Sequence, residues 1–297
     1  MVERRRLSHA RAHVTLASVV VVWAGAFAAI KHLLSAGLTG PEIAAARFLL
    51  AAPGFAVAFW WSRGLPGAGR AELIRIAVAG VLVVAVYHVA LNQGERYTTA
   101  GTAAIVIGTA PAIALGLAIA IGLERFSAWR AAGLAVAFGG VVVAVTLGSG
   151  EQVSAQAVRG PLLVLVSACS FALYNVLVKP MMQRFGPVPV SSAANLIGLL
   201  PLLPLLSASS IGHARALGTL DWALVLYLGL VCTLFAYIAW TVALRHLDAS
   251  RTVAYLYGVP PLAVLIGALT LSEPVTVWLV LGGMLVIGGV AAAQVRA

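Results

Sequence analysis

The sequence predicts an all-α integral membrane protein in which ten transmembrane helices form two inverted five-helix repeats. Composition is the first reason: 62% of the residues are hydrophobic and 9% are charged, whereas a soluble domain carries about 25% charged residues because its surface faces water. The second is a series of apolar runs, each near the roughly 20 residues that an α-helix needs to cross a bilayer. The third is an internal repeat at a fixed offset, which indicates a duplicated fold.

The apolar runs are predicted to be helices because backbone groups in lipid must be hydrogen-bonded within the segment itself. The predicted helices span 13–35, 41–61, 71–93, 98–121, 127–147, 159–180, 188–208, 221–243, 250–271 and 275–295. The basic start of the chain and the first apolar run resemble a cleavable signal peptide. That run, however, continues to Leu34 and is long enough to span. We therefore expect the first helix to remain in the protein.

The repeat divides the chain into two predicted domains, 13–147 and 159–295, joined by the polar linker 148–158. Residues of the first half that recur 149 positions later are Ala100, Pro111, Glu124, Trp129, Gly133, Gly139 and Gly140, which match Ala249, Pro260, Glu273, Trp278, Gly282, Gly288 and Gly289. Because five passes is an odd number, the second half enters the membrane from the opposite side. Such inverted repeats recur in secondary transporters, with the binding site near the midplane.

Charge sets the predicted orientation. Of the 19 lysines and arginines, 14 fall on the side of the predicted helices that holds the N-terminus and 5 on the other. An excess of Lys and Arg marks the cytoplasmic side, so both termini are expected in the cytoplasm and the protein in the cytoplasmic (inner) membrane. The net charge of +10 is explained by this topology and not by nucleic acid. The expected partners are the lipid bilayer and a small-molecule substrate, with the chain acting as a monomer or homodimer.

No catalytic residue, metal site or cofactor is predicted. The sequence lacks His-Glu-x-x-His, Gly-x-Ser-x-Gly, Walker A and Cys-x-x-Cys patterns. We therefore expect the protein not to be an enzyme, although an intramembrane lipid-modifying enzyme remains an alternative. The carboxylates fall at helix ends or in loops, which leaves His88 as the central group that titrates near neutral pH. His88 is either a proton carrier or a packing residue.

Several residues carry a family resemblance. Trp23–Phe27 with Lys31, Pro41–Arg47 and Ala243–Arg245 before Ala249, together with the repeated Pro, Glu and Gly residues, resemble the EamA repeat of the drug/metabolite transporter superfamily. In layout the chain is similar to ten-helix bacterial exporters, among them the YddG-type amino acid exporters.

The resemblance covers about 15–145 and 160–293. It implies a secondary transporter that exports amino acids, including aromatic ones, and related small metabolites by alternating access. The chain departs from the family pattern at Gly94-Glu95, where Ala-Leu is common, and at Asn195, which replaces an arginine. Alternatives are efflux of drugs or of another metabolite class, and an assembly or sensor protein that transports nothing.

A partly polar helix face suggests where substrate binds. His88 and Asn92 share a face of the third helix because they are four residues apart, and the repeat maps this face to one with Tyr237 and Trp240 on the eighth. The face either lines a central cavity with aromatic walls or forms a hydrogen-bonded packing seam. The candidate substrate-binding residues are Trp23, Tyr87, His88, Asn92, Tyr237, Trp240 and Tyr255.

Prolines at equivalent places predict bends in the fourth and ninth helices. Proline has no N–H and leaves a carbonyl one turn earlier unbonded, and such a carbonyl could accept a ligand's ammonium group. The candidate hinges are Pro111, Gly258 and Pro260. The alternative is a static kink satisfied by a threonine or by water.

Three further features have structural or functional interpretations. Arg47 could hold a substrate carboxylate, or it could extend towards the lipid surface or pair with Glu42 or Glu95. Glu124 and Glu273 are placed to interact with the N-terminal ends of the fifth and tenth helices. The glycines expected to permit close helix packing are Gly133, Gly139, Gly140, Gly282, Gly283, Gly288 and Gly289.

Overall fold

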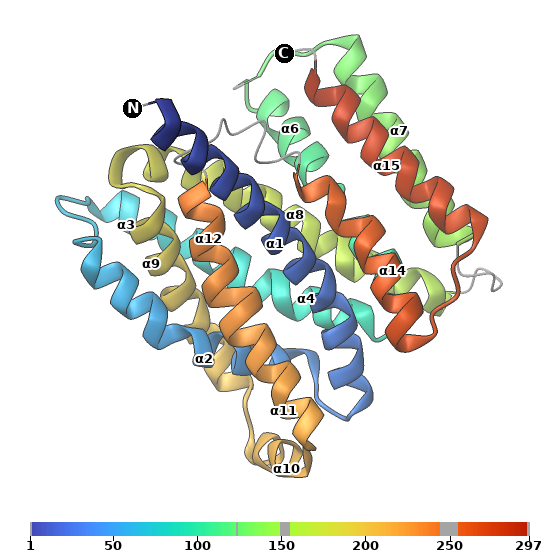
Figure 1. Ribbon diagram of the computed structural model, residues 1–297, viewed down its shortest axis with the longest axis horizontal. Coiled ribbons are helices and arrows are strands. Elements are labelled where there is room, and N and C mark those ends of the chain that lie inside the picture. Colours follow the sequence, from blue (N-terminus) through green and yellow to red (C-terminus); the bar gives the residue numbers. More distant parts are fainter. Residues whose placement is uncertain (1, 123, 149–154, 244–254, 296–297) are drawn as a thin grey trace.

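Membrane-spanning helices make up the fold, as the composition predicts. The computed structural model describes residues 2–122, 124–148, 155–243 and 255–295 (Figure 1). Within these ranges nine helices are long and apolar enough to cross a membrane, and a shorter apolar helix covers Tyr255–Leu271. Most of the predicted linker 148–158 and the start of the predicted helix 250–271 lie outside the described residues.

Each half supplies five passes, several of which are divided into segments. The first half contains α1 (Val2–Ser35), α2 (Gly40–Trp61), α3 (Arg70–Gly80), η1 (Val81–Val86), α4 (Tyr87–Glu95), α5 (Ala100–Ile107), α6 (Ala110–Ala120) and α7 (Ala128–Thr146). The second half contains α8 (Ala155–Phe185), α9 (Pro187–Leu199), η2 (Leu200–Leu205), α10 (Ala208–Ala216), α11 (Thr219–Leu226), η3 (Tyr227–Phe235), α12 (Ala236–Ala243), η4 (Tyr255–Gly258), α14 (Val259–Leu271) and α15 (Val277–Val295).

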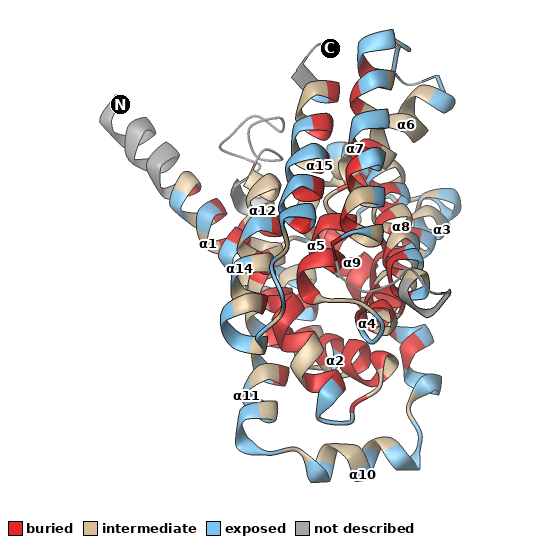
Figure 2. Cartoon of the chain, turned by 90° about the vertical axis from the view of Figure 1, so that its right-hand side faces the viewer, coloured by how far each residue is buried: buried red, intermediate tan, exposed pale blue. Residues whose placement is uncertain are grey.

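The bundle has two distinct ends. The start of α1 and the end of α15 lie together at one end, here called the N/C end, and α10 lies at the opposite end, here called the α10 end (Figure 1). Because α8 begins the second half after five passes, it crosses in the opposite direction to α1. Buried residues concentrate in the middle of the bundle, around α2, α4, α5 and α9, while α10 shows mainly exposed and half-buried residues (Figure 2).

Two π-helical segments occupy equivalent places in the two halves. The segment η1 ends at Val86 and η3 ends at Phe235, and these two positions are 149 residues apart. A carbonyl of each segment accepts a hydrogen bond from a side chain five residues later: His88 Nδ1 of α4 donates to Val83 O at 2.9 Å, and Thr233 Oγ1 of η3 donates to Leu228 O at 2.8 Å. Such π segments are frequent at functional sites. The apolar pattern of the sequence did not reveal them.

At the predicted bends the helices are interrupted. In the first half α5 ends at Ile107 and α6 starts at Ala110, directly before Pro111. In the second half the 3₁₀ segment η4 precedes α14, which starts at Val259, directly before Pro260. Thr109 is buried and its hydroxyl donates to Val106 O at 2.6 Å, a carbonyl that also accepts the Thr109 N–H at 3.1 Å. These bonds do not involve Ile107 O, the carbonyl that loses its donor at Pro111.

Four of the seven predicted packing glycines lie between α7 and α15. A Cβ built on Gly140 would lie 2.6 Å from the carbonyl oxygen of Gly282. Gly133 and Gly289 are in equally close contact, since a Cβ on Gly133 would lie 2.7 Å from Gly289 O. The prediction was wrong for the other three: nothing lies within 4 Å of a Cβ on Gly139 or Gly288, and Gly283 faces Ile105 instead. The small residues permit backbone contact between the two helices.

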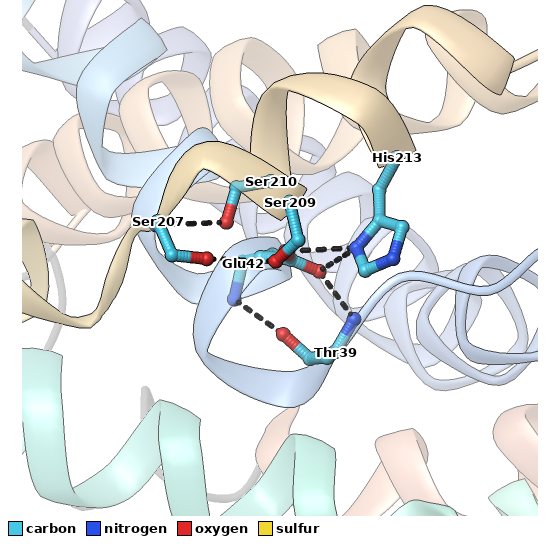
Figure 3. A network of polar contacts seen from close by, with 6 residues as sticks. All are labelled: Thr39, Glu42, Ser207, Ser209, Ser210 and His213. Atoms are coloured by element: carbon cyan, nitrogen blue, oxygen red, sulfur yellow. Dashed lines mark hydrogen bonds and ion pairs between the residues drawn. The ribbon is translucent and has the colours of Figure 1, made fainter.

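The helix α10, which the sequence analysis did not predict, is tied to the start of α2 by a polar network (Figure 3). Glu42 closes a capping box at the N-terminus of α2, where its Oε2 accepts the N–H of Thr39 at 2.8 Å. His213 Nδ1 of α10 contacts Glu42 Oε1 at 2.9 Å. The Glu42 side chain is 7% exposed and that of His213 is 41% exposed. Glu42 therefore serves the cap and the contact with α10 at once.

This double role predicts unequal effects of two substitutions. Glu42→Ala should lower the free energy of unfolding by about 1–2 kcal/mol, because it removes a helix cap together with the contact to α10. His213→Ala should cost less than about 1 kcal/mol, as for other exposed ion pairs. Thermal denaturation of the detergent-purified protein would measure both. Equal losses for the two variants would contradict the assignment of the cap to Glu42.

Candidate functional site

A cavity of about 200 Å³ lies between the two halves. Its wall includes both helix breaks, at Pro111 and Pro260. It also includes Tyr87, the first residue after η1, and Tyr237, the second residue after η3. The lining continues to Met182 and to Pro187, where α8 ends and α9 begins. Because α8 runs towards the N/C end, the cavity extends towards that end of the bundle.

Five of the seven candidate binding residues line this cavity: Trp23, Tyr87, His88, Tyr237 and Trp240. They come from α1, α4 and α12, and they pack against one another. The ring centroids of Trp23 and Trp240 are 5.4 Å apart, and those of Trp23 and Tyr237 are 6.0 Å apart. The indole of Trp23 also donates to the Cys232 carbonyl at 3.0 Å, which attaches α1 to η3. The result is a wall of aromatic faces in which Trp23 is fixed by a hydrogen bond.

His88 is held in a defined orientation. Its side chain is 2% exposed, and the bond from Nδ1 to Val83 O assigns the proton of the neutral ring to Nδ1. Its ring lies edge-on to Phe48 at 4.7 Å and to Tyr87 at 4.6 Å. With Nδ1 engaged, Nε2 is the nitrogen left to accept a hydrogen bond from a ligand. Its place in the wall is compatible with both interpretations made from the sequence.

Arg47 is the residue whose importance the sequence left undecided. It lies in the middle of α2, is 4% exposed and lines the cavity. Its Nε donates to Thr233 Oγ1 at 2.9 Å, and its guanidinium lies 5.8 Å from the Phe48 ring. Its terminal nitrogens form no hydrogen bond or ion pair with any residue in the described part of the chain.

The structure does not bear out the alternatives considered for Arg47. The carboxylate of Glu42 contacts His213, and that of Glu95 has no hydrogen-bond partner among the described residues. Arg47 is also the one residue with a fixed charge in the described lining of the cavity. A buried guanidinium with free N–H groups is a receptor for a carboxylate, because its planar fork can donate two parallel hydrogen bonds.

Asn92 and Tyr255 lie elsewhere. The Asn92 amide donates to Gly40 O at 2.9 Å and joins α4 to the start of α2, away from the cavity lining. The Tyr255 hydroxyl is hydrogen-bonded to His13 Nδ1 at 2.7 Å, and the Tyr255 side chain packs against Leu16, so both of these contacts are with α1. His88 and Asn92 both lie in α4, one helical turn apart, so they meet different neighbours although they share a face. Tyr257, two residues after Tyr255, lines the cavity in its place.

The helix breaks leave residues of the cavity wall without their usual backbone donors. Pro111 cannot donate to the carbonyl of Ile107, four residues earlier, and Pro260 cannot donate to that of Leu256. Ile107 and Leu256 both line the cavity, and they are equivalent positions in the two repeats, 149 residues apart. Each half thus has one wall residue whose carbonyl lacks its usual helical donor.

Glu273 has a different partner from the one predicted. Its oxygens accept the backbone N–H groups of Ala100 at 2.8 Å and Gly101 at 3.3 Å, at the start of α5, so it holds two passes together. Glu124 pairs with Arg130 of α7 at 3.3 Å. Within the described residues, no three His, Cys, Asp or Glu side chains are grouped so that they could hold a metal ion.

Membrane-crossing helices, duplicated breaks and an internal cavity between the halves define a polytopic transporter architecture. Residues 10–146 and 158–293 each match the EamA-like transporter family. The chain belongs to this family, a branch of the drug/metabolite transporter superfamily, which confirms the resemblance found in the sequence. The two matches also agree with the duplicated, ten-helix fold class.

Relatives match over nearly their whole length. An "uncharacterized transporter" of Archaeoglobus fulgidus is 33% identical over 280 residues, 93% of this chain and 96% of that protein. A "probable terminal-alkyne amino-acid exporter" of Streptantibioticus cattleyicolor is 32% identical over 278 residues, 93% of this chain and 90% of that protein. A crystal structure with 17% identity superposes with a TM-score of 0.62 over 97% of this chain and 98% of its own, which supports the fold.

Proposed function

We propose that the protein exports amino acids, including aromatic ones, and related small carboxylate metabolites across the cytoplasmic membrane by alternating access. The observation that carries the proposal is Arg47, a buried cation with free N–H groups in an aromatic cavity. Its charge suits a carboxylate and disfavours a purely cationic drug. The relative named as a probable terminal-alkyne amino-acid exporter supports the same substrate class.

Each part of an amino acid has a complementary surface in the cavity. The carboxylate would bind Arg47, and the ammonium group would meet the carbonyls of Ile107 and Leu256, since oxygens without a donor attract N–H groups. An apolar or aromatic side chain would lie against Trp23 and Tyr237, because aromatic pairs prefer edge-to-face or offset contacts. His88 Nε2 is an additional acceptor at the wall.

Transport would alternate the access of this cavity. We place the N/C end in the cytoplasm because 14 of the 19 lysines and arginines lie on that side. The cavity extends towards this end, so the conformation is the one in which an exporter loads its substrate. The breaks at Pro111, Gly258 and Pro260 would be the hinges, as few helical hydrogen bonds have to be lost there.

Counterflow in proteoliposomes tests the proposal. Vesicles loaded with unlabelled phenylalanine should take up labelled phenylalanine in the absence of ATP. Phenethylamine should neither be taken up nor compete with phenylalanine, because it lacks the carboxylate that would bind Arg47. Protein-free vesicles supply the baseline. Movement of phenethylamine at the rate of phenylalanine, or no movement of any amino acid tested, would refute the proposal.

A further inference from the structure

A second buried ionisable residue, Glu95, lies outside the cavity lining. It is the last residue of α4, near the α10 end, and is 0% exposed. Both carboxylate oxygens are enclosed, and neither has a hydrogen-bond partner in the parts of the chain that the structure describes. An ionised carboxylate in such a place loses its hydration and gains no hydrogen bond in return, which favours the neutral, protonated form.

The Lys31 ammonium lies close to Glu95 but does not bond its carboxylate. The Lys31 ammonium donates to two backbone carbonyls, Glu95 O and Thr98 O, each at 2.7 Å. It forms no ion pair with the Glu95 carboxylate, and neither does any other described lysine, arginine or histidine. The second carboxylate in electrostatic range, Glu273, is bound to the start of α5. Lys31 thus fastens α1 to the end of α4 through backbone carbonyls and makes no hydrogen bond with the carboxylate of Glu95.

The surroundings of Glu95 contain few other charges. The titratable and charged side chains at this end of α4 and of the elements packed against it are Lys31 of α1, Glu42 and Arg47 of α2, Arg159 of α8, Glu273 before α15, His88 of α4 itself and Arg96 directly after it. Lys31, Glu273 and Arg47 are within electrostatic range of the carboxyl group. Arg159 instead covers the ring of Tyr97 at 4.4 Å.

Glu95 also lies where the bundle is closed. The glycine before it, Gly94, packs directly on α8: a Cβ there would lie 2.9 Å from Gly160 O. Asn92 closes the same region by its bond to Gly40. An opening of the α10 end has to separate these contacts and would bring water to the carboxyl group.

We propose that Glu95 is a proton-binding site, occupied while the α10 end is packed closed and able to release its proton when that end opens. The reaction is the ionisation of the carboxylic acid, with the proton passing to water at the opened end. The opening and closing of that end rest on the proposed alternating access. Acid on the α10 side then favours the closed conformation, and the transport rate depends on the pH of that side.

Infrared difference spectroscopy on the purified protein tests the site without any transport. The wild-type protein at neutral pH should show the C=O stretching band of a protonated carboxylic acid, and Glu95→Gln should remove it. Glu124→Gln makes the same chemical change at an exposed carboxylate and should leave the band. A wild-type spectrum without the band, or a band that persists in Glu95→Gln, would overturn the proposal.

Transport measurements give the second readout. In proteoliposomes Glu95→Gln, which mimics the protonated acid, should remove the dependence of the exchange rate on pH at the α10 side, whereas Glu124→Gln keeps it. Glu95→Asp retains an acid and should retain the dependence. An unaltered pH profile in Glu95→Gln would overturn the proposal. If no substrate moves in any variant, the proposed function fails, while the infrared band still decides the protonation of Glu95.

Discussion

Replacing Arg47 with glutamine is expected to weaken the binding of phenylalanine by roughly 10- to 100-fold, because a hydrogen bond to a charged group is worth about 1.5–3 kcal/mol. Arg47→Lys should recover only part of the affinity, since an ammonium keeps the charge but not the two parallel donors. The half-saturation concentration for counterflow measures the effect. Arg96→Gln, at an exposed arginine, should leave it unchanged.

The stability of the same variant separates a binding role from a structural one. The guanidinium is buried with one hydrogen bond, to Thr233, and no ion pair among the described residues. Removing a buried charge that has no counter-ion relieves the cost of its desolvation, so the melting temperature of Arg47→Gln should not fall. A large fall in melting temperature with unchanged substrate affinity would show that Arg47 serves the fold.

Substitution of Gly140 by leucine should destabilise the protein by about 3 kcal/mol, at the upper end of the cost of overpacking. A Cβ at this position would lie 2.6 Å from the backbone oxygen of Gly282, and backbone cannot rotate away as a side chain can. The helices α7 and α15 would have to separate. Thermal unfolding in detergent would register the loss.

The neighbouring residue supplies the control for this prediction. Gly139 is in the same helix, yet a Cβ there would have nothing within 4 Å. Gly139→Leu therefore introduces the same side chain without a clash, and replacing glycine in a helix favours the folded state. Equal destabilisation by the two variants would show that the contact between α7 and α15 is not close in solution.

Much of the fold follows from local properties of the sequence. Hydrocarbon thickness sets the length of each pass, so apolar runs of suitable length predicted the helices closely. The prolines at 111 and 260 predicted the breaks, because proline removes a backbone donor from its own helix. Pro53, Pro161 and Pro180 nevertheless lie within continuous helices, so proline alone does not decide where a helix breaks. The π segments and α10 escaped prediction, since an apolar pattern does not distinguish π from α geometry and α10 depends on contacts with Glu42.

The site was predicted less completely, and the failures have one cause. The helical period placed His88 and Asn92 on one face, but the structure directs the first to the cavity and the second to Gly40. Tyr255 was chosen where Tyr257 lines the wall, at a point where the chain leaves α-helical geometry. Periodicity within one helix cannot show which neighbour each side chain meets.

The sequence by itself determined that the chain crosses the membrane ten times in two related halves, because these properties arise from hydropathy, proline and a fixed repeat offset. Only the tertiary structure decided that, among the described residues, Arg47 faces the cavity without a counter-ion and the Glu95 carboxylate is enclosed without a hydrogen-bond partner. The physical reason is that the state of a buried charge depends on atoms contributed by several helices far apart in the chain.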